Sequence, residues 1–375
     1  MRVPSEQVIG TPGDTGSDLS MLLSQFIQDV GYKGAPNSYD KALFEAMVKR
    51  AGQIGIPITP NSKSWHLFKY GYTYPCVCFP DFPLDVKVYV GLYSWIGLFI
   101  DDEGHTKEVE EFQRRFTAGE EQPTLVLRAW ADIINECYSY YDPLSANLIV
   151  TSSLYFTTMT NLDHRKEFQG RLPAKHAQDY PLYIRDRSGI GEAFALFTFP
   201  KAQFPDLSKY LEAVPNMIAY IGFTNDILSF YKEEKAGEVD NYVRTMSMYE
   251  SKEPILVLRD LATKVFVTLD RIRSIMNGKA EYADAWDKHE KGYVAFHTLS
   301  RRYKLHEIGL GEEFVGDELD WTFRDYEAGA RYASTPSANE GPWIKKGAAL
   351  PADLDIHSSM DSDHSPGFRV TTKIT

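Results

Sequence analysis

Cysteine is scarce in this chain, and the features of exported and membrane-spanning proteins are missing. Three cysteines, at positions 76, 78 and 137, are spread over 375 residues. They are too few, and odd in number, for a disulfide framework, so the composition indicates a reducing compartment, the cytoplasm. Residues 1–20 lack the charged start and apolar core of a secretory signal. The longest apolar run, residues 88–100, has 13 residues, whereas about 20 are needed to cross a bilayer.

An excess of positive charge is also missing. The chain carries 40 lysines and arginines against 52 aspartates and glutamates, a net charge of -12. A nucleic-acid-binding protein would be expected to present a basic face, so we expect no nucleic acid as a partner. A cation beside a functional motif gains weight here, because it would be an isolated positive charge aimed at an anion.

Cys76 and Cys78 form half of a metal-binding pattern. No second pair of cysteines or histidines at zinc-like spacing accompanies them. We therefore interpret both as buried thiols.

The hydrophobic pattern is helical throughout, and no alternating strand run competes with it. We expect helices over residues 39–51, 83–100, 106–117, 124–140, 143–161, 185–197, 207–234, 253–277 and 281–303. Pro215 should kink or restart one of them, because proline removes a backbone hydrogen bond and clashes one turn back. The predicted fold class is all-α.

Composition suggests one large globular unit with two tails. Residues 1–35 begin with glycine, proline, serine and aspartate, and we expect a flexible segment there. Residues 36–333 form the predicted domain, with 43% of the whole chain hydrophobic and enough length for a substantial core. Residues 334–375 are again rich in proline, serine, glycine and aspartate and are expected to be an extended tail.

One segment places three oxygen-bearing side chains on a single helical face. Asn225, Ser229 and Glu233 follow one another at intervals of four residues, so they drift by only about 40° per step. Amide, hydroxyl and carboxylate oxygens suit a hard cation such as Mg²⁺ and do not suit zinc. The segment follows an apolar run, so the cluster opens toward an apolar interior.

A second acidic cluster, Asp101-Asp102-Glu103, ends the apolar run at residues 88–100. Adjacent helical residues point about 100° apart, so we expect only one of the two aspartates, Asp101, to face the site squarely. Taken alone, this cluster is more often a solvated acidic turn. Buried aromatics are likewise more often plain core than cavity lining, and this applies to Trp95, Phe156, Trp286, Tyr293 and Phe296.

Two further elements complete a resemblance to the class I terpene cyclases of the fungal trichodiene synthase family. Arg302-Tyr303 is similar to the family's Arg-Tyr pair, and Arg185 with Gly189-Ile190-Gly191 is similar to its diphosphate-sensing segment. In that family the acidic cluster and the Asn-Asp-x-x-Ser-x-x-x-Glu pattern face each other across the mouth of an apolar pocket. The resemblance covers about residues 83–333. Glu103-Gly104-His105 departs from the family, which has further acidic residues there, and this indicates a sister enzyme with another product.

The resemblance implies a single class I terpenoid synthase bundle of helices around an apolar cavity. It implies ionisation of farnesyl diphosphate with Mg²⁺, three ions in number, and cyclisation to a trichodiene-like or longiborneol-like sesquiterpene or alcohol. The implied roles are metal binding by Asp101, Asn225, Ser229 and Glu233; diphosphate binding by Arg185, Lys232, Arg302 and Tyr303; catalysis by Asp101, Arg302 and Tyr303; and a pocket wall at Phe156.

Rival functions are weaker. A His-Asp phosphohydrolase would need a His-Asp dipeptide, and none of the nine histidines precedes an aspartate. The protonating Asp-x-Asp-Asp motif of class II cyclases is also absent. A non-catalytic isoprenoid-binding protein stays open, although it would have no reason to keep both acidic clusters. We expect no membrane span, and we leave a homodimer open.

Overall fold

The fold is built from helices only. The computed structural model describes residues 14–35, 39–59, 62–103, 107–162, 165, 167–168, 174 and 176–313, and no strand occurs among them. This confirms the predicted all-α class. None of the helices in these ranges is long and apolar enough to cross a membrane.

The α-helices are α1 (Asp14–Asp29), α2 (Lys41–Ile54), α3 (Lys63–Cys78), α4 (Leu84–Glu103), α5 (Lys107–Glu110), α6 (Phe112–Ala118), α7 (Leu125–Tyr140), α8 (Pro143–Thr160), α9 (Tyr180–Ser188), α10 (Gly191–Phe197), α11 (Val214–Ala236), α12 (Tyr242–Glu250), α13 (Pro254–Met276) and α14 (Ala280–Leu299). Short 3₁₀ turns are η1 (Leu207–Lys209), η2 (Leu211–Ala213), η3 (Arg301–Tyr303) and η4 (Leu305–Ile308).

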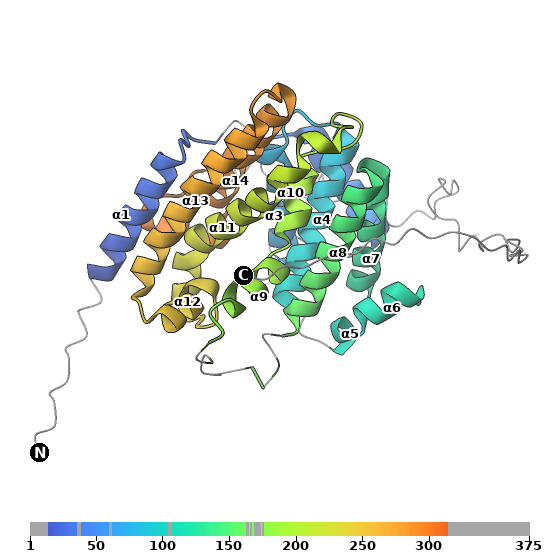
Figure 1. The fold of residues 1–375 in the computed structure, drawn as a ribbon. Helices are drawn as coiled ribbons and strands as arrows, with labels where there is room; N and C mark the ends of the chain where they lie inside the picture. Colours follow the sequence, from blue (N-terminus) through green and yellow to red (C-terminus); the bar gives the residue numbers. More distant parts are fainter. Residues whose placement is uncertain are drawn as a thin grey trace, which may run out of the picture. The chain divides into compact units, whose positions relative to one another are not determined.

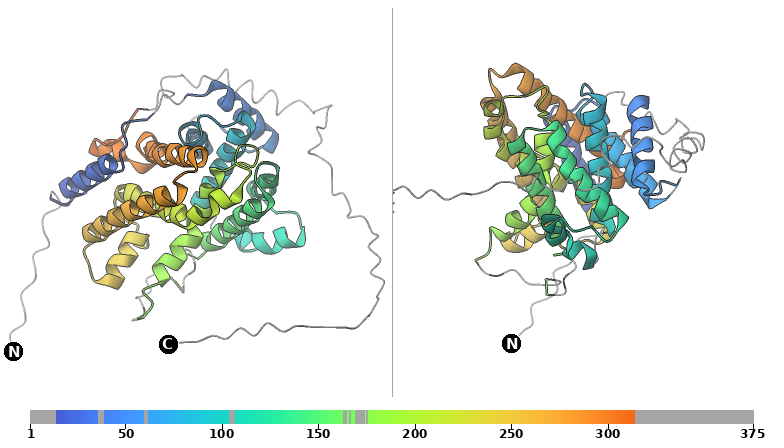
Figure 2. Two further views of the ribbon diagram at one scale, coloured as in Figure 1. Left: turned by 45° about the horizontal axis from the view of Figure 1, so that its top comes forward. Right: turned by 90° about the vertical axis from the view of Figure 1, so that its right-hand side faces the viewer.

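Helices α3 and α4 run side by side through the middle of the bundle, with α14 against α3 and α11 between α10 and α13 (Figure 1). Gly71 allows the close approach of α3 to α4, because a Cβ there would lie 2.7 Å from the Gly91 carbonyl oxygen. Trp95, Trp130 and Trp286 are fully buried in the surrounding core. Two turned views show α7 and α8 flanking α4 (Figure 2).

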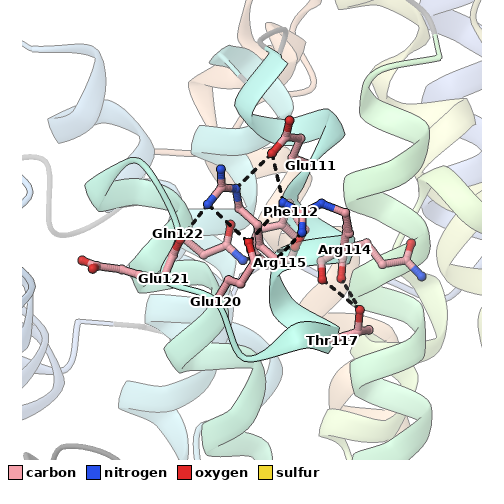
Figure 3. Close-up of polar contacts among 9 residues, drawn as sticks. Glu111, Phe112, Arg114, Arg115, Thr117, Glu120, Glu121 and Gln122 are labelled. Carbon is pink, nitrogen blue, oxygen red and sulfur yellow. Dashed lines mark hydrogen bonds and ion pairs between the residues drawn. The ribbon is translucent and has the colours of Figure 1, made fainter.

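Helix α6 projects from this bundle (Figure 1) and ends in a polar turn (Figure 3). Arg114 binds Glu120 through both terminal nitrogens at 2.7 and 3.1 Å. Gln122 is buried, and its side-chain nitrogen donates to the Phe112 carbonyl at 3.1 Å. The exposed ion pair adds little stability, so we assign the fixing of this turn to the buried amide.

Two predicted helices divide, and a third restarts at a proline. The expected helix at 185–197 is split into α9 and α10 by Gly189 and Ile190, and Ile190 adopts a left-handed φ of 50°. Pro215 lies in the first turn of α11, so it restarts a helix as predicted. The expected helix at 106–117 is interrupted between α5 and α6. Helices α3 and α12 were not predicted.

The N-terminal segment differs from the expectation of flexibility over the part that is described. Helix α1 buries Leu23 and Phe26 against the bundle, and the Phe26 ring lies 6.0 Å from the ring of Phe266 on α13. Residues 1–13 and the expected tail at 334–375 lie outside the described residues. The domain boundaries stay a prediction.

Candidate active site

A cavity of about 930 Å³ lies between α3, α4, α8, α9, α10, α11, α12, α14 and η3. All nine side chains selected from the sequence line it: Asp101, Phe156, Arg185, Asn225, Ser229, Lys232, Glu233, Arg302 and Tyr303. They come from segments up to about 200 residues apart, so the fold brings together what the sequence keeps separate.

The oxygen-bearing face of α11 borders this cavity. The Ser229 hydroxyl donates to a carboxylate oxygen of Glu233 at 2.5 Å, which is the i, i+4 contact that the spacing predicts. Ser229 is buried, and burial raises the pKa of Glu233 to about 7, although the Ser229 hydroxyl and Lys232 oppose the rise. A carboxylate that is costly to keep charged in isolation has a reason to accept a cation.

Asn225 is oriented by a buried histidine. His297 Nδ1 lies 2.7 Å from the Tyr293 carbonyl oxygen, so that nitrogen must carry the hydrogen. Its Nε2 then accepts from the Asn225 amide nitrogen at 3.2 Å. Burial lowers the pKa of His297 to about 4, which keeps the ring neutral at pH 7. His297 thus engages the side-chain nitrogen of Asn225, and the side-chain oxygen of Asn225 can interact with other groups.

Arg185 on α9 is clamped onto α11. Its Nε donates to Asp226 at 2.6 Å, and its Nη2 donates to the Gly222 carbonyl at 3.0 Å and to the Asn225 side-chain oxygen at 3.3 Å. Among the described residues, no hydrogen bond involves Arg185 Nη1. This nitrogen lies next to Gly189, and a Cβ built on Gly189 would lie 2.0 Å from it. Burial raises the pKa of Asp226 to about 6 against the pull of Arg185.

At the acidic end of α4, the structure differs from the expectation that only Asp101 faces the site. Both Asp101 and Asp102 line the cavity, whereas the 100° argument favoured Asp101 alone. Arg302 donates to Asp102 from two nitrogens, at 3.1 and 2.8 Å, and to Asp101 at 3.0 Å. Burial opposes ionisation of Asp102, but Arg302 outweighs it and lowers the pKa of that carboxyl. The Asp102 side chain is 20% exposed and that of Asp101 is 52% exposed, so Asp102 is the more enclosed ligand of Arg302.

The remaining cavity groups are polar side chains and aromatic rings. Lys232 lines the cavity and forms an ion pair with Glu238 at 3.9 Å. Tyr303 is buried against His297, with ring centres 4.1 Å apart.

Three of the five singled-out aromatics line the cavity: Phe156, as the resemblance implies, and Tyr293 and Phe296, contrary to the plain-core interpretation. Trp95 and Trp286 are core residues as expected. Tyr74, Tyr93 and Phe194 extend the aromatic wall. Cys76 and Cys78 are free and buried, which confirms the interpretation as thiols.

The oxygen donors that line the cavity fit a hard divalent cation. Asn225, Ser229 and Glu233 offer only oxygen, and two carboxylates of α4 border the same cavity. Within the described ranges, no three His, Cys, Asp or Glu side chains form a metal-holding group by themselves, since the α11 set contains a single carboxylate. The set therefore suits an ion that also takes ligands from a bound diphosphate.

Sequence reasoning ranked Asp102 below Asp101 and missed two neighbours of the site residues, Asp226 and His297. Asp226 directly follows Asn225, but its partner Arg185 lies 41 residues earlier, and spacing along the chain does not reveal such a pair. His297 precedes Arg302 by five residues without any pattern around it. The only available signal was the closeness of each to a motif residue.

The fold is the all-α fold of the class I terpene synthases. A linalool/nerolidol synthase from Streptomyces clavuligerus has the same fold, with a TM-score of 0.54 over 71% of this chain and 98% of that one at 11% identity.

The sequence relatives give the family. Residues 71–337 match the model of the trichodiene synthase (TRI5) family, and the chain belongs to that family. The longiborneol synthase of Gibberella zeae is 40% identical over 80% of this chain and 92% of its own length. The terpene synthase BipA of Cochliobolus sativus is 36% identical over 81% and 94%. The chain is thus a terpene synthase, a lyase.

Proposed function

We propose that this enzyme ionises farnesyl diphosphate with Mg²⁺ and cyclises the cation to a longiborneol-like or trichodiene-like sesquiterpene. The observation that carries the proposal is the division of one cavity. The cavity is lined both by polar side chains that stay at least partly exposed, such as Asp101, Lys232 and Arg302, and by buried aromatic rings, such as Tyr93, Phe156 and Phe296. An amphipathic substrate with an anionic head and an apolar tail matches that division.

The head of the substrate would be bound by Arg185, Lys232, Arg302 and Tyr303. Arg185 is suited to this because its bonds to α11 hold the guanidinium in one place, so little entropy is lost when an anion binds. Arg302 is held by Asp101 and Asp102 on α4. Its planar guanidinium has further N–H groups that can donate to the diphosphate. These donors would stabilise the negative charge that grows as the carbon–oxygen bond breaks.

The ligands proposed for Mg²⁺ are Asp101 and Asp102 on α4 together with Asn225, Ser229 and Glu233 on α11. Bound there, the ion would supply Lewis acidity toward the leaving diphosphate. The Ser229 hydrogen must turn away from Glu233 to free both oxygens, and Asn225 needs no such change because His297 already holds its amide nitrogen.

The apolar interior would fold the farnesyl chain. Cleavage leaves the bonding electron pair on diphosphate and an allylic cation on carbon, which aromatic faces stabilise by ~0.5 to 2 kcal/mol each. Phe156, Tyr293 and Phe296 supply such faces. The final cation loses a proton to give a hydrocarbon, or adds water and then loses a proton to give an alcohol.

The test is an incubation of purified enzyme with the C10, C15 and C20 isoprenyl diphosphates and Mg²⁺, followed by mass spectrometry of the volatile products. We expect the C15 substrate to give a cyclic sesquiterpene or its alcohol. Turnover of only the C10 or C20 substrate would overturn the assignment of farnesyl diphosphate.

A further inference from the structure

The N-terminal segment reaches the part of the chain that carries Arg302 and Tyr303. After α1 ends at Asp29, the chain continues through Tyr32 to Ala35, and both residues contact Glu312. The Tyr32 hydroxyl donates to Glu312 Oε1 at 2.6 Å, and the Ala35 backbone nitrogen donates to Glu312 Oε2 at 2.8 Å. Both oxygens of one carboxylate are therefore held by a segment 277 to 280 residues away in sequence.

Glu312 in turn closes a loop back onto α14. Its backbone nitrogen donates to the Thr298 carbonyl at 2.9 Å, and the buried Thr298 hydroxyl donates to Glu312 Oε1 at 2.8 Å. Thr298 adjoins His297, which holds Asn225, and the loop from 298 to 312 contains Arg302 and Tyr303. The contacts between Glu312 and Thr298 thus hold the two ends of this loop together.

Two more contacts hold the middle of this loop. The Ser20 hydroxyl on α1 donates to the Ile308 carbonyl at 3.2 Å. Glu307 accepts from Lys235 and from the Tyr231 hydroxyl at the end of α11. The loop is therefore tied to α1 on one side and to the proposed metal-binding helix on the other.

The backbone conformation at Gly34 supports this arrangement. Gly34 adopts a φ of 115°, which favours glycine, and this turn brings the Ala35 nitrogen to Glu312. Glu312 and Tyr32 are both half-buried, so their hydrogen bond is partly shielded from water. Hydrogen bonds to a charged acceptor are stronger than neutral ones.

We propose that residues 14–35 act as a strap whose Tyr32–Glu312 clamp positions Arg302 and Tyr303 for the closed, reactive arrangement. Tyr32 and Glu312 are positioning residues, because neither lines the cavity. The inference rests on the proposed function, since it assigns Arg302 and Tyr303 to the leaving diphosphate. A loop held at both ends keeps the guanidinium fork aligned, and a displacement near 1 Å at such a group can cost about a hundredfold in rate.

The test compares Tyr32→Phe, Glu312→Gln and their double variant in the full-length enzyme. Tyr138→Phe is the matched control, because it removes a hydroxyl that donates at 2.7 Å to Asn147 on the α7–α8 face. Steady-state kinetics with farnesyl diphosphate, Tm and amide hydrogen exchange over residues 300–310 are measured for each. We expect kcat to fall about tenfold in each clamp variant, with KM and Tm close to wild type, and exchange to quicken at 300–310.

The double variant should lose no more than the worse single variant, because hydroxyl and carboxylate act as one unit. Unchanged kcat in both single variants, or a fall in Tm with wild-type kcat and exchange, would overturn the strap. If Glu312→Gln fails to fold, Tyr32→Phe alone decides, since it keeps the ring. Failure of the wild type to turn over farnesyl diphosphate would refute the proposed function instead, and the exchange measurement would still test the strap.

Discussion

Gly189→Ala is a sharp probe of Arg185, because the two residues touch. A Cβ at position 189 would lie 2.0 Å from Arg185 Nη1, and ordinary contact begins at 3.4 Å, so the nitrogen must retreat by about 1.4 Å. The guanidinium cannot simply swing aside, since Asp226 and the Gly222 carbonyl hold it. Gly189 has a φ of -89°, which alanine adopts without strain.

The size of the effect follows from the bond that is disturbed. A hydrogen bond to a charged group contributes about 1.5 to 3 kcal/mol, so losing the contact between Arg185 and Asp226 should lower kcat/KM by about ten- to a hundredfold. In the absence of the clash, replacing glycine by alanine would stabilise the protein by about 0.4 to 1 kcal/mol. The two effects have opposite signs.

The assay is steady-state kinetics with farnesyl diphosphate together with a thermal melt. Gly222→Ala is the matched control, because its Cβ would meet the same guanidinium at 3.9 Å, an ordinary contact. We expect the control to keep wild-type kcat/KM. Wild-type kinetics in Gly189→Ala with an equal or higher Tm would refute the claim that Arg185 must stay where α11 holds it.

Three further predictions concern other parts of the enzyme. Arg302→Lys should lower kcat at least about tenfold with little change in KM, because lysine lacks the planar fork that holds Asp102; a change in KM alone would show that Arg302 gives only uniform binding. Phe156→Ala should shift the products toward simpler, earlier-quenched hydrocarbons while diphosphate release continues; an unchanged product spectrum would make Phe156 core. Burial raises the pKa of Glu290 to about 7, so the native state holds a proton that the unfolded chain releases from about pH 4.5 upward, and Glu290 should destabilise the fold progressively between pH 4.5 and 7. Glu290→Gln should therefore gain up to about 3 kcal/mol relative to wild type across that interval in denaturant titrations, and a constant difference would contradict the assignment.

The α11 motif could be predicted from sequence because its geometry is local. Three side chains at intervals of four residues share a helical face whatever the rest of the fold does, and Ser229 indeed contacts Glu233. The all-α class follows for the same reason, since helical periodicity is a property of each segment. The division between α9 and α10 was missed, because the periodic pattern continues across Gly189 and Ile190.

The pairing of charges could not be predicted, because it depends on how helices pack. Arg302 meets Asp102 across 200 residues, and the rotation of α4 about its axis decides which aspartate is enclosed. The 100° argument concerns the angle between adjacent side chains and does not give the position of the cavity. Likewise, α1 was expected to be flexible since its composition is polar at the start, whereas Leu23 and Phe26 find a surface only in the folded bundle.

The most direct measurement is diphosphate release from farnesyl diphosphate as a function of Mg²⁺ concentration, in the wild type and in Glu233→Ala. We predict that wild-type release requires Mg²⁺. We expect Glu233→Ala to lose at least about a hundredfold in kcat and to need more Mg²⁺, with an unchanged helical circular dichroism spectrum. Wild-type release by Glu233→Ala at the same Mg²⁺ concentration, or wild-type release without a divalent cation, would contradict the account.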